Sequence, residues 1–154
     1  SAATGMQLTF HRAFDVIADP DAALEDLLAL GCDRLLTSGC AHSAVEGQAT
    51  LRRLVRAANG QIAIIAAAGL SAANVAGVVQ FAGVNGVHAG TSVTQLQPAN
   101  SACTANAVSM ANSDRGRVDA FPRVDASLVA EFALAALAQR NARAHEGCSA
   151  IADR

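Results

Sequence analysis

The sequence predicts an α/β fold made of parallel strand–helix repeats. Short apolar strands recur about every 25 residues, and an amphipathic helical segment follows each of the first three. Neighbouring parallel strands need a crossover of about a dozen residues or more, which a helix supplies. With 154 residues, 52% of them apolar, the chain is long enough for about one domain with a buried core.

The first repeat combines a strand at residues 6–11 with a helix that begins at Asp19. Asp is a favoured N-cap residue, and Pro20 at the first helical position loses no N–H group that the helix needs. Gly31 lies where the helix needs a residue in the left-handed conformation to end. Local sequence therefore defines this first helix at both ends.

Further strands and helices follow in the same alternating order. The predicted elements are a strand at 34–37, a helix with Leu51 and Leu54 that ends at Asn59–Gly60, a strand at 61–66, a turn at Ala67–Gly69, a helix capped by Ser71, and a strand at 86–88. The spacing between these strands is what favours parallel pairing.

The periodicity stops after His88. Residues 89–123 show no sustained pattern, and we predict a long irregular loop there, either functional or disordered. Asp125 is predicted to cap a last helix that extends to about residue 137, and residues 141–154 are predicted to form a flexible tail. These boundaries give one domain over residues 1–140.

Composition excludes several classes of function. A formal net charge of −2 argues against nucleic acid as a partner, and no apolar window is long enough for a membrane span. Every cation is Arg, so chemistry that needs a Lys nucleophile is excluded. The 4 cysteines contain no Cys-x-x-Cys pair, which predicts reduced thiols and a cytoplasmic location rather than a zinc site or a disulfide scaffold.

Polar residues and glycines follow each predicted strand. Because the carboxyl ends of parallel strands converge on one face, where ligands bind, we predict a ligand- or anion-binding site there. The candidates are Thr9, His11 and Arg12 after the first strand, Thr37, Ser38 and Gly39 after the second, Gly69 after the third and His88 at the end of the fourth. His11 and His88 are also the candidates for a catalytic acid or base, because imidazole titrates near neutral pH.

These candidates also have structural interpretations. Arg12 fits an ion pair with Asp15 or Asp19, and residues 37–39 and 67–69 fit ordinary turns. Either histidine also fits a purely structural role, in which its ring nitrogens are hydrogen-bonded within the fold. Both interpretations stay open at this point.

Cys40 and His42 are two metal-ligand types close together in the sequence. They offer one soft and one borderline donor. Two ligands do not make a metal site, so we regard them as weak candidates.

The string Leu8–Asp15 (LTFHRAFD) is unusually specific. Together with residues 22–25 (AALE) and 35–39 (LLTSG), it resembles the copper homeostasis protein CutC family. Supporting positions follow in order at Glu46–Gly47, Gly60–Ile62, Gly69–Leu70 and Val87–His88. The resemblance extends over residues 8–137, with the last helix similar to the family's closing segment.

The resemblance implies a (β/α)8 TIM barrel, of which this chain is the C-terminal half, about strands 5–8. Half a barrel leaves one sheet edge and the inner face open. We therefore expect a fragment, a truncated protein that associates with a second copy through the open edge, or a marginally stable chain. The metal-ligand cysteines that the family implies belong to the absent half, so none of the cysteines here inherits that role.

Three functional interpretations follow from the resemblance and the residues. The first is a protein of copper homeostasis without catalytic turnover, with a copper ion or a small ligand as its partner. The second is an enzyme of the phosphate-binding barrel type, in which Arg12 and the loop after Ala67 hold an anion. The third is an inactive remnant. The family's Gly-rich turn appears here as Ala67–Gly69, and the added methyl groups are predicted to hinder close approach of an anion.

Overall fold

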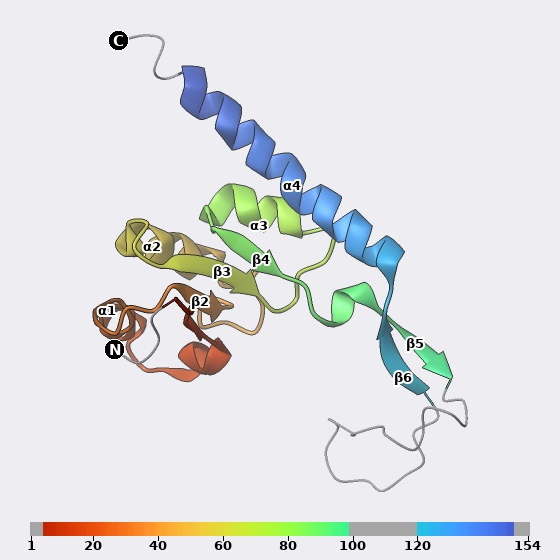
Figure 1. The fold of residues 1–154 in the computed structure, drawn as a ribbon, viewed down its shortest axis with the longest axis horizontal. Coiled ribbons are helices and arrows are strands. Elements are labelled where there is room, and N and C mark those ends of the chain that lie inside the picture. Colours follow the sequence, from red (N-terminus) through yellow and green to blue (C-terminus); the bar gives the residue numbers. More distant parts are fainter. Residues whose placement is uncertain (1–4, 99–119, 150–154) are drawn as a thin grey trace, which may run out of the picture.

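Parallel strands and helices alternate through the first part of the chain, as predicted. The computed structural model describes residues 5–98 and 120–149. The elements of the alternating region are β1 (Thr9–Phe10), the 3-10 helix η1 (Arg12–Val16), α1 (Pro20–Ala29), β2 (Arg34–Thr37), α2 (Gln48–Ala58), β3 (Ala63–Ala67), α3 (Val75–Ala82) and β4 (Gly86–His88). The four strands pair in the order β1-β2-β3-β4, and every pair is parallel (Figure 1).

The sequential strand order places the helices on one face of the sheet, because such crossovers are almost always right-handed. Alternate residues of the strands point to this face, and Leu35 and Ile64 there are fully buried. They pack in a core with apolar residues of the helices and loops, chiefly Phe14, Leu24, Leu51, Leu54, Ile62, Val75 and Val78. On the opposite face, Leu36 and Ile65 stay partly exposed. Within the described residues, β1 and β4 each have a single strand neighbour, so both edges of this sheet are open.

The predicted helix signals of the first repeat are confirmed. The Asp19 carboxylate accepts hydrogen bonds from the backbone N–H groups of Asp21 and Ala22, both at 3.1 Å. Gly31 has a φ of +72°, the left-handed conformation expected after the helix. Satisfying these terminal groups fixes where α1 begins and ends.

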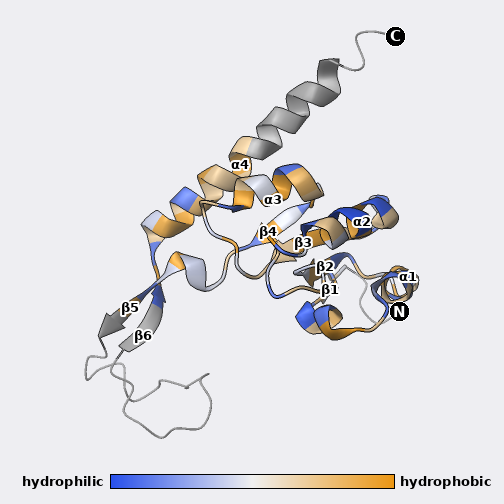
Figure 2. Ribbon diagram, turned by 180° about the vertical axis from the view of Figure 1, so that it is seen from behind, coloured by the Kyte–Doolittle hydropathy of each residue, from blue (hydrophilic) through white to orange (hydrophobic). Residues whose placement is uncertain are grey.

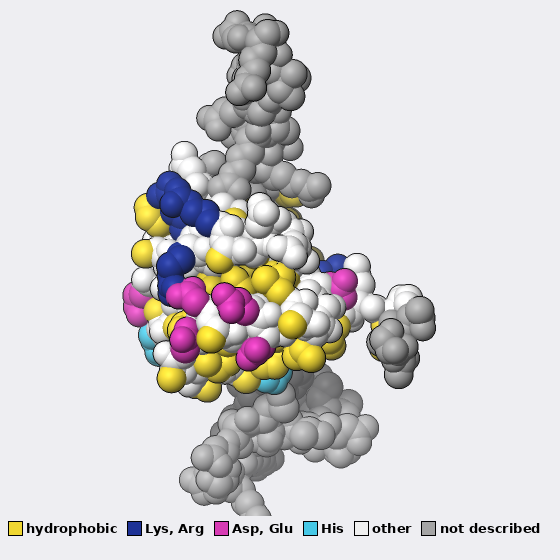
Figure 3. Space-filling model, turned by 90° about the vertical axis from the view of Figure 1, so that its left-hand side faces the viewer, with side chains coloured by type: hydrophobic (Ala, Val, Ile, Leu, Met, Phe, Trp, Pro, Cys, Tyr) yellow, Lys and Arg dark blue, Asp and Glu magenta, His cyan; other side chains and the backbone are white. Residues whose placement is uncertain are grey.

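Charged side chains of both signs lie next to one another on the outer side of the helices (Figure 3). Arg53 of α2 forms an ion pair with Asp21 of α1. The Arg52 guanidinium lies 5.2 Å from the centre of the Phe81 ring, which joins α2 to α3. These exposed contacts connect successive helices at a modest energetic gain.

Three predicted boundaries are wrong. The strand predicted at 61–66 spans Ala63–Ala67. The first strand is confined to Thr9–Phe10, and the third helix begins at Val75 rather than near Ser71. A turn precedes this helix because the Ser71 N–H donates to the Asn74 side chain at 2.9 Å, while the Ser71 carbonyl accepts from Val75 at 3.0 Å. Ser71 therefore starts a turn that leads into the helix.

The predicted irregular loop at 89–123 is wrong at both of its ends. After a short 3-10 helix, η2 (Thr91–Val93), the strand β5 (Thr94–Pro98) pairs antiparallel with β6 (Ala120–Val124). This hairpin extends away from the parallel sheet (Figure 1). Its formation depends on pairing between segments far apart in the chain, which local periodicity does not reveal. Residues 99–119 of the predicted loop lie outside the described residues.

The last helix, α4 (Ala126–Ser149), is longer than predicted. The predicted cap is confirmed, because the Asp125 carboxylate accepts from Ser127 at 2.8 Å and from Leu128 at 3.1 Å. The helix continues past residue 141, so the predicted flexible tail is wrong up to Ser149; residues 150–154 lie outside the described part.

The helix α4 packs against α3. Phe132 is buried there with the core, and the facing parts of the two helices are apolar (Figure 2). No helix among the described residues combines the length and the apolar character needed to cross a bilayer.

Candidate functional site

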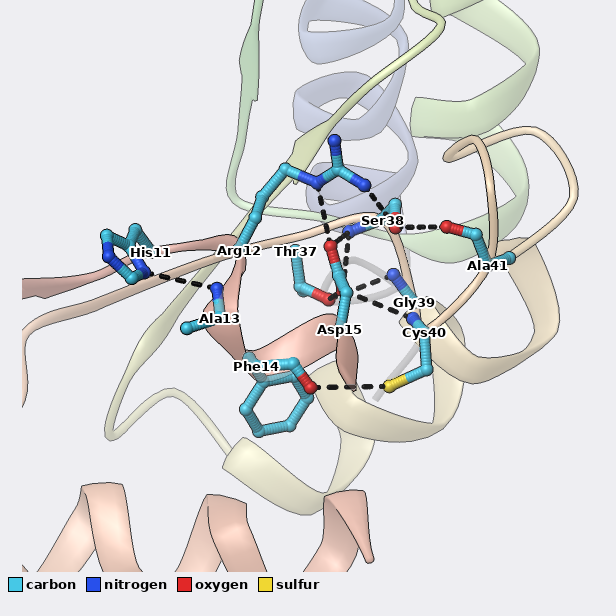
Figure 4. A network of polar contacts seen from close by, with 10 residues as sticks. All are labelled: His11, Arg12, Ala13, Phe14, Asp15, Thr37, Ser38, Gly39, Cys40 and Ala41. Carbon is cyan, nitrogen blue, oxygen red and sulfur yellow. Dashed lines mark hydrogen bonds and ion pairs between the residues drawn. The ribbon is translucent and has the colours of Figure 1, made fainter. Parts of the chain in front are cut away.

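The Asp15 carboxylate connects the loops that follow β1 and β2 (Figure 4). It lies on η1 and accepts hydrogen bonds from the Thr37 hydroxyl at 2.5 Å, from the Ser38 N–H at 3.0 Å and from the Cys40 N–H at 3.2 Å. It also pairs with the Arg12 Nε at 2.8 Å. One nearly buried carboxylate therefore holds two loops of the sheet rim together.

These contacts determine the charge state of Asp15. Burial alone would raise its pKa, but the hydrogen bonds from Thr37, Arg12 and Ser38 outweigh burial and lower the pKa below its ordinary value. Asp15 is therefore a carboxylate at neutral pH. Its negative charge compensates that of Arg12 beside it.

The loop after β2 binds this internal carboxylate. Thr37 and Ser38 are fully buried, and the Thr37 hydroxyl also accepts the Gly39 N–H at 2.9 Å. These groups, predicted to bind an external anion, thus have partners inside the chain: the Thr37 hydroxyl and the Ser38 N–H bind Asp15, and the Gly39 N–H binds the Thr37 hydroxyl. The Ser38 hydroxyl donates to the Ala41 carbonyl at 2.6 Å. The alternative pairing of Arg12 with Asp15 is confirmed, and Asp19 instead caps α1.

Two glycines allow this loop to lie directly against the start of α2. Gly39 has a φ of +76°, and a Cβ placed on Gly47 would overlap the Ser38 carbonyl group. Side chains at either position would separate the loop from the helix. The loop geometry around Asp15 therefore requires glycine on both sides.

A cavity of about 410 Å³ lies at the carboxyl ends of β2, β3 and β4. Its lining residues are Arg12, Leu36, Ala67, Ala68, Gly69, Leu70, Ser71, His88, Gly90, Thr91 and Ser92. The volume lies within the ordinary range for small-molecule sites. The predicted convergence of strand ends is thus present in the structure, and it brings Arg12, Gly69 and His88 to one cavity.

Arg12 belongs to both the Asp15 network and the cavity. Its Nε pairs with Asp15, and one terminal nitrogen donates to the Ser38 hydroxyl at 3.4 Å. The other terminal nitrogen points away from both partners (Figure 4). Because 45% of the side chain is exposed, the guanidinium is accessible to a ligand.

The loop after β3 forms one wall of the cavity in a strained conformation. Ala68 and Gly69 both have positive φ angles, +76° and +67°. The Asn74 side chain fixes this loop by donating to the Gly69 carbonyl and accepting from the Ser71 N–H, both at 2.9 Å. Ala68 therefore occupies a backbone position that favours glycine.

Other predicted site residues lie elsewhere. Thr9 and His11 are exposed and do not line the cavity. The His11 Nδ1 accepts the Ala13 N–H at 3.1 Å, which caps η1. Sequence reasoning missed the cavity residues Thr91 and Ser92, because they follow β4 inside the segment predicted to be irregular.

The described residues do not fit a copper site. They contain no group of three or more His, Cys, Asp or Glu side chains placed to hold a metal ion. The Cys40 thiol contacts the Phe14 carbonyl at 3.8 Å, and its pKa is raised by burial and by the nearby Asp15 charge. A thiol with a raised pKa is a poor metal ligand at neutral pH, because thiolates bind metals. His42 is exposed.

A parallel sheet in the sequential order β1-β2-β3-β4, with a ligand-sized cavity at the strand carboxyl ends, is the arrangement of a segment of a barrel-type α/β protein. The chain belongs to the CutC family, whose model matches residues 1–93. The resemblance of the LTFHRAFD string is therefore confirmed. The match ends before β5, so the expected likeness of the last helix to the family's closing segment lies beyond it.

Similar proteins support this assignment. A family protein CutC from Pasteurella multocida (strain Pm70) is 49% identical over 87 residues, which cover 56% of this chain and 36% of the relative. One from Xanthomonas axonopodis pv. citri (strain 306) is 51% identical over 88 residues, or 57% of this chain and 37% of the relative. The crystal structure of the putative copper homeostasis protein CutC from Streptococcus agalactiae has 35% identity and a TM-score of 0.52, covering 55% of this chain and 42% of that one. The chain thus spans little more than a third of the length of its curated relatives.

Proposed function

We propose that this CutC-family chain binds a small anion-bearing ligand in the cavity at the strand carboxyl ends. The observation that carries the proposal is the convergence of Arg12, Gly69 and His88 on one cavity of about 410 Å³. The Arg12 guanidinium supplies charge-assisted hydrogen bonds, which are stronger than neutral ones. Thr91 and Ser92 of η2 also line the cavity and add hydroxyl groups to its polar residues.

The apolar part of the lining favours an organic ligand. Leu36, Ala67 and Leu70 face the cavity between the polar groups. Sites of this kind combine mostly apolar walls with a few polar groups that fix orientation. A ligand with an anionic end and a short apolar body therefore suits the cavity better than a bare ion.

We further propose that the ligand connects this protein to copper homeostasis, the role in the name of the Streptococcus agalactiae relative. In this proposal copper is handled by the wider homeostasis system and is not held by Cys40 and His42, because these two residues do not form a metal site with other described residues. A cytoplasmic location and association of copies through the open sheet edge remain part of this proposal.

The enzymatic alternative now rests on His88. This residue lines the cavity, whereas His11 lies outside it, so a general acid or base would be His88. The inactive-remnant alternative predicts no ligand binding at all.

Backbone amide chemical shifts test the proposal directly. Titration of the folded chain with methanesulfonate is expected to shift the signals of Gly69, Leu70 and Gly90 in a saturable manner. Arg12→Gln is expected to weaken this binding about tenfold, because it removes the charged donor. Arg34→Gln, a surface change outside the cavity, serves as the matched control. Absence of saturable shifts in the wild type would contradict the proposed function.

A further inference from the structure

Two carbonyl groups of the loop after β3 are bound on the side of the helices. The Ala68 carbonyl accepts the Ala44 N–H at 3.0 Å, and the Gly69 carbonyl accepts the Asn74 side-chain amide at 2.9 Å. Ala44 precedes α2 and Asn74 directly precedes α3, and neither residue lines the cavity of about 410 Å³. Both carbonyl groups therefore point toward the layer of helices, although the residues that carry them line the cavity.

The N–H groups that follow these carbonyls face the opposite way. In a planar trans peptide, a carbonyl and the N–H of the next residue point in opposite directions, and the described residues contain no cis peptide bond. The Gly69 N–H is therefore opposed to the Ala68 carbonyl, and the Leu70 N–H is opposed to the Gly69 carbonyl. Two consecutive backbone donors are turned from the helices toward the cavity.

No described residue accepts a hydrogen bond from the N–H of Gly69 or Leu70. Leu70 is buried, and buried backbone N–H groups of native proteins are almost always paired. A partner outside the chain, water or a ligand, is therefore needed to complete both donors. Consecutive backbone N–H groups in a turn bind anionic oxygen atoms.

The Asn74 side chain fixes the backbone on both sides of Leu70. Its amide nitrogen donates to the Gly69 carbonyl before Leu70, and its amide oxygen accepts the Ser71 N–H after it, both at 2.9 Å. Rotation of the peptide that carries the Leu70 N–H would break the first of these bonds. Asn74 therefore determines where this donor points.

We propose that Asn74 is a positioning residue of the cavity, which holds the Leu70 N–H, beside that of Gly69, toward the anionic group of the ligand. The inference rests on the function proposed above and narrows the ligand to one with an oxyanion head group, such as a sulfonate or a phosphate ester. Several oxygens of such a group can use the neutral N–H donors of the loop together with the Arg12 guanidinium, which lines the same cavity.

Methanesulfonate is the probe for the wild-type chain. A hydrogen bond to an anionic oxygen moves the signal of an amide proton downfield. The amide protons of Gly69 and Leu70 are therefore expected to move downfield and to saturate with the same dissociation constant. A ligand that binds only at Arg12 would not produce this pair of downfield shifts.

Asn74→Ala tests the positioning role. It is expected to lower the methanesulfonate affinity about threefold to tenfold and to reduce the downfield shift of Leu70, because the loop loses the bonds that orient this N–H. Asn85→Ala is the matched control: its side chain accepts the Ile64 N–H at 2.9 Å and lies outside this cavity. Both variants lose bonds between an Asn side chain and the backbone, but only Asn74→Ala is expected to lose affinity.

The outcomes separate the inference from the proposed function. If methanesulfonate produces no saturable shifts in the wild type, the proposed function is wrong and the inference is lost with it. If it binds without moving the amide protons of Gly69 and Leu70 downfield, or if Asn74→Ala binds it as tightly as Asn85→Ala does, the inference alone is overturned. If Asn74→Ala does not fold, the wild-type shifts decide.

Discussion

Replacement of Gly47 by Ala is expected to destabilise the fold strongly. Gly47 precedes α2 with an ordinary φ of −83°, so backbone conformation does not oppose Ala. The obstacle is contact: the new Cβ would overlap the Ser38 carbonyl oxygen and lie 2.9 Å from its carbon. Both partners are backbone atoms, which cannot rotate away as a side chain can. The loop after β2 would have to move away from α2. The N–H groups of this loop that bind Asp15 would move as well.

The cost lies at the upper end of the range for overpacking, about 3 kcal/mol or more. In a chain of this size, about 3 kcal/mol corresponds to a fall in melting temperature of about 6–12 °C. Far-UV circular dichroism at a series of temperatures, with urea unfolding at 25 °C, measures both quantities provided that unfolding is two-state.

Gly77→Ala is the matched control. Gly77 lies within α3, and a Cβ there would have no atom within 4 Å. Because Gly inside a helix loses more conformational entropy on folding than Ala does, this substitution is expected to stabilise the chain by about 0.5–1 kcal/mol. Two identical chemical changes are therefore expected to act in opposite directions. Equal effects on the melting temperature would refute the packing described for the β2 loop.

Three further predictions concern the site. The Asp15 pKa is lower in the folded chain than in the unfolded one, so the ionised carboxylate stabilises the fold fully above about pH 4. This stabilisation is lost as the pH falls through the folded pKa. In urea unfolding, the free energy of unfolding should therefore fall less between neutral pH and pH 3 for Asp15→Asn than for the wild type. Ala68→Gly should remove the strain of a side chain at positive φ and raise the free energy of unfolding by about 0.5–1 kcal/mol in the same assay. A lower free energy of unfolding would show that Ala68 is not strained. Cys40→Ser and His42→Ala should leave any Cu(I) affinity unchanged in titrations against a competing chelator, whereas weaker binding would place copper at these residues.

Much of the fold could be predicted because its signals are local. The Asp19–Pro20 start and the Gly31 end of α1 each depend on a few neighbouring residues, and both were predicted correctly. The 34–37 and 86–88 strands were also predicted with their observed bounds. The start of α3 was missed because Asn74, rather than Ser71, sits at the N-cap, and the Ser71–Asn74 turn resembles a capping sequence.

The hairpin and the long helix could not be predicted in the same way. Thr94 pairs with Val124, and the intervening residues carry no periodic pattern that indicates the pairing. The α4 helix continues beyond its predicted end through residues 138–149, whose sequence shows little of the amphipathic pattern by which a helix is predicted. Pairing between distant segments and helices without an amphipathic pattern are therefore the two features that pattern analysis misses in this chain.

The site shows a similar limit, and it has a functional consequence. Hydroxyl and N–H groups in a glycine-containing loop indicate an anion partner, and the Thr37–Gly39 loop does bind an anion, but that anion is Asp15 of the same chain. The partner lies in η1 and is separated from the loop by the whole of α1, so only the fold reveals the pairing. Once Asp15 occupies these donors, the Arg12 side chain is what the network presents to the cavity. An external anion in the cavity would therefore meet the Arg12 guanidinium, whose charge Asp15 already compensates, rather than the donors of residues 37–39.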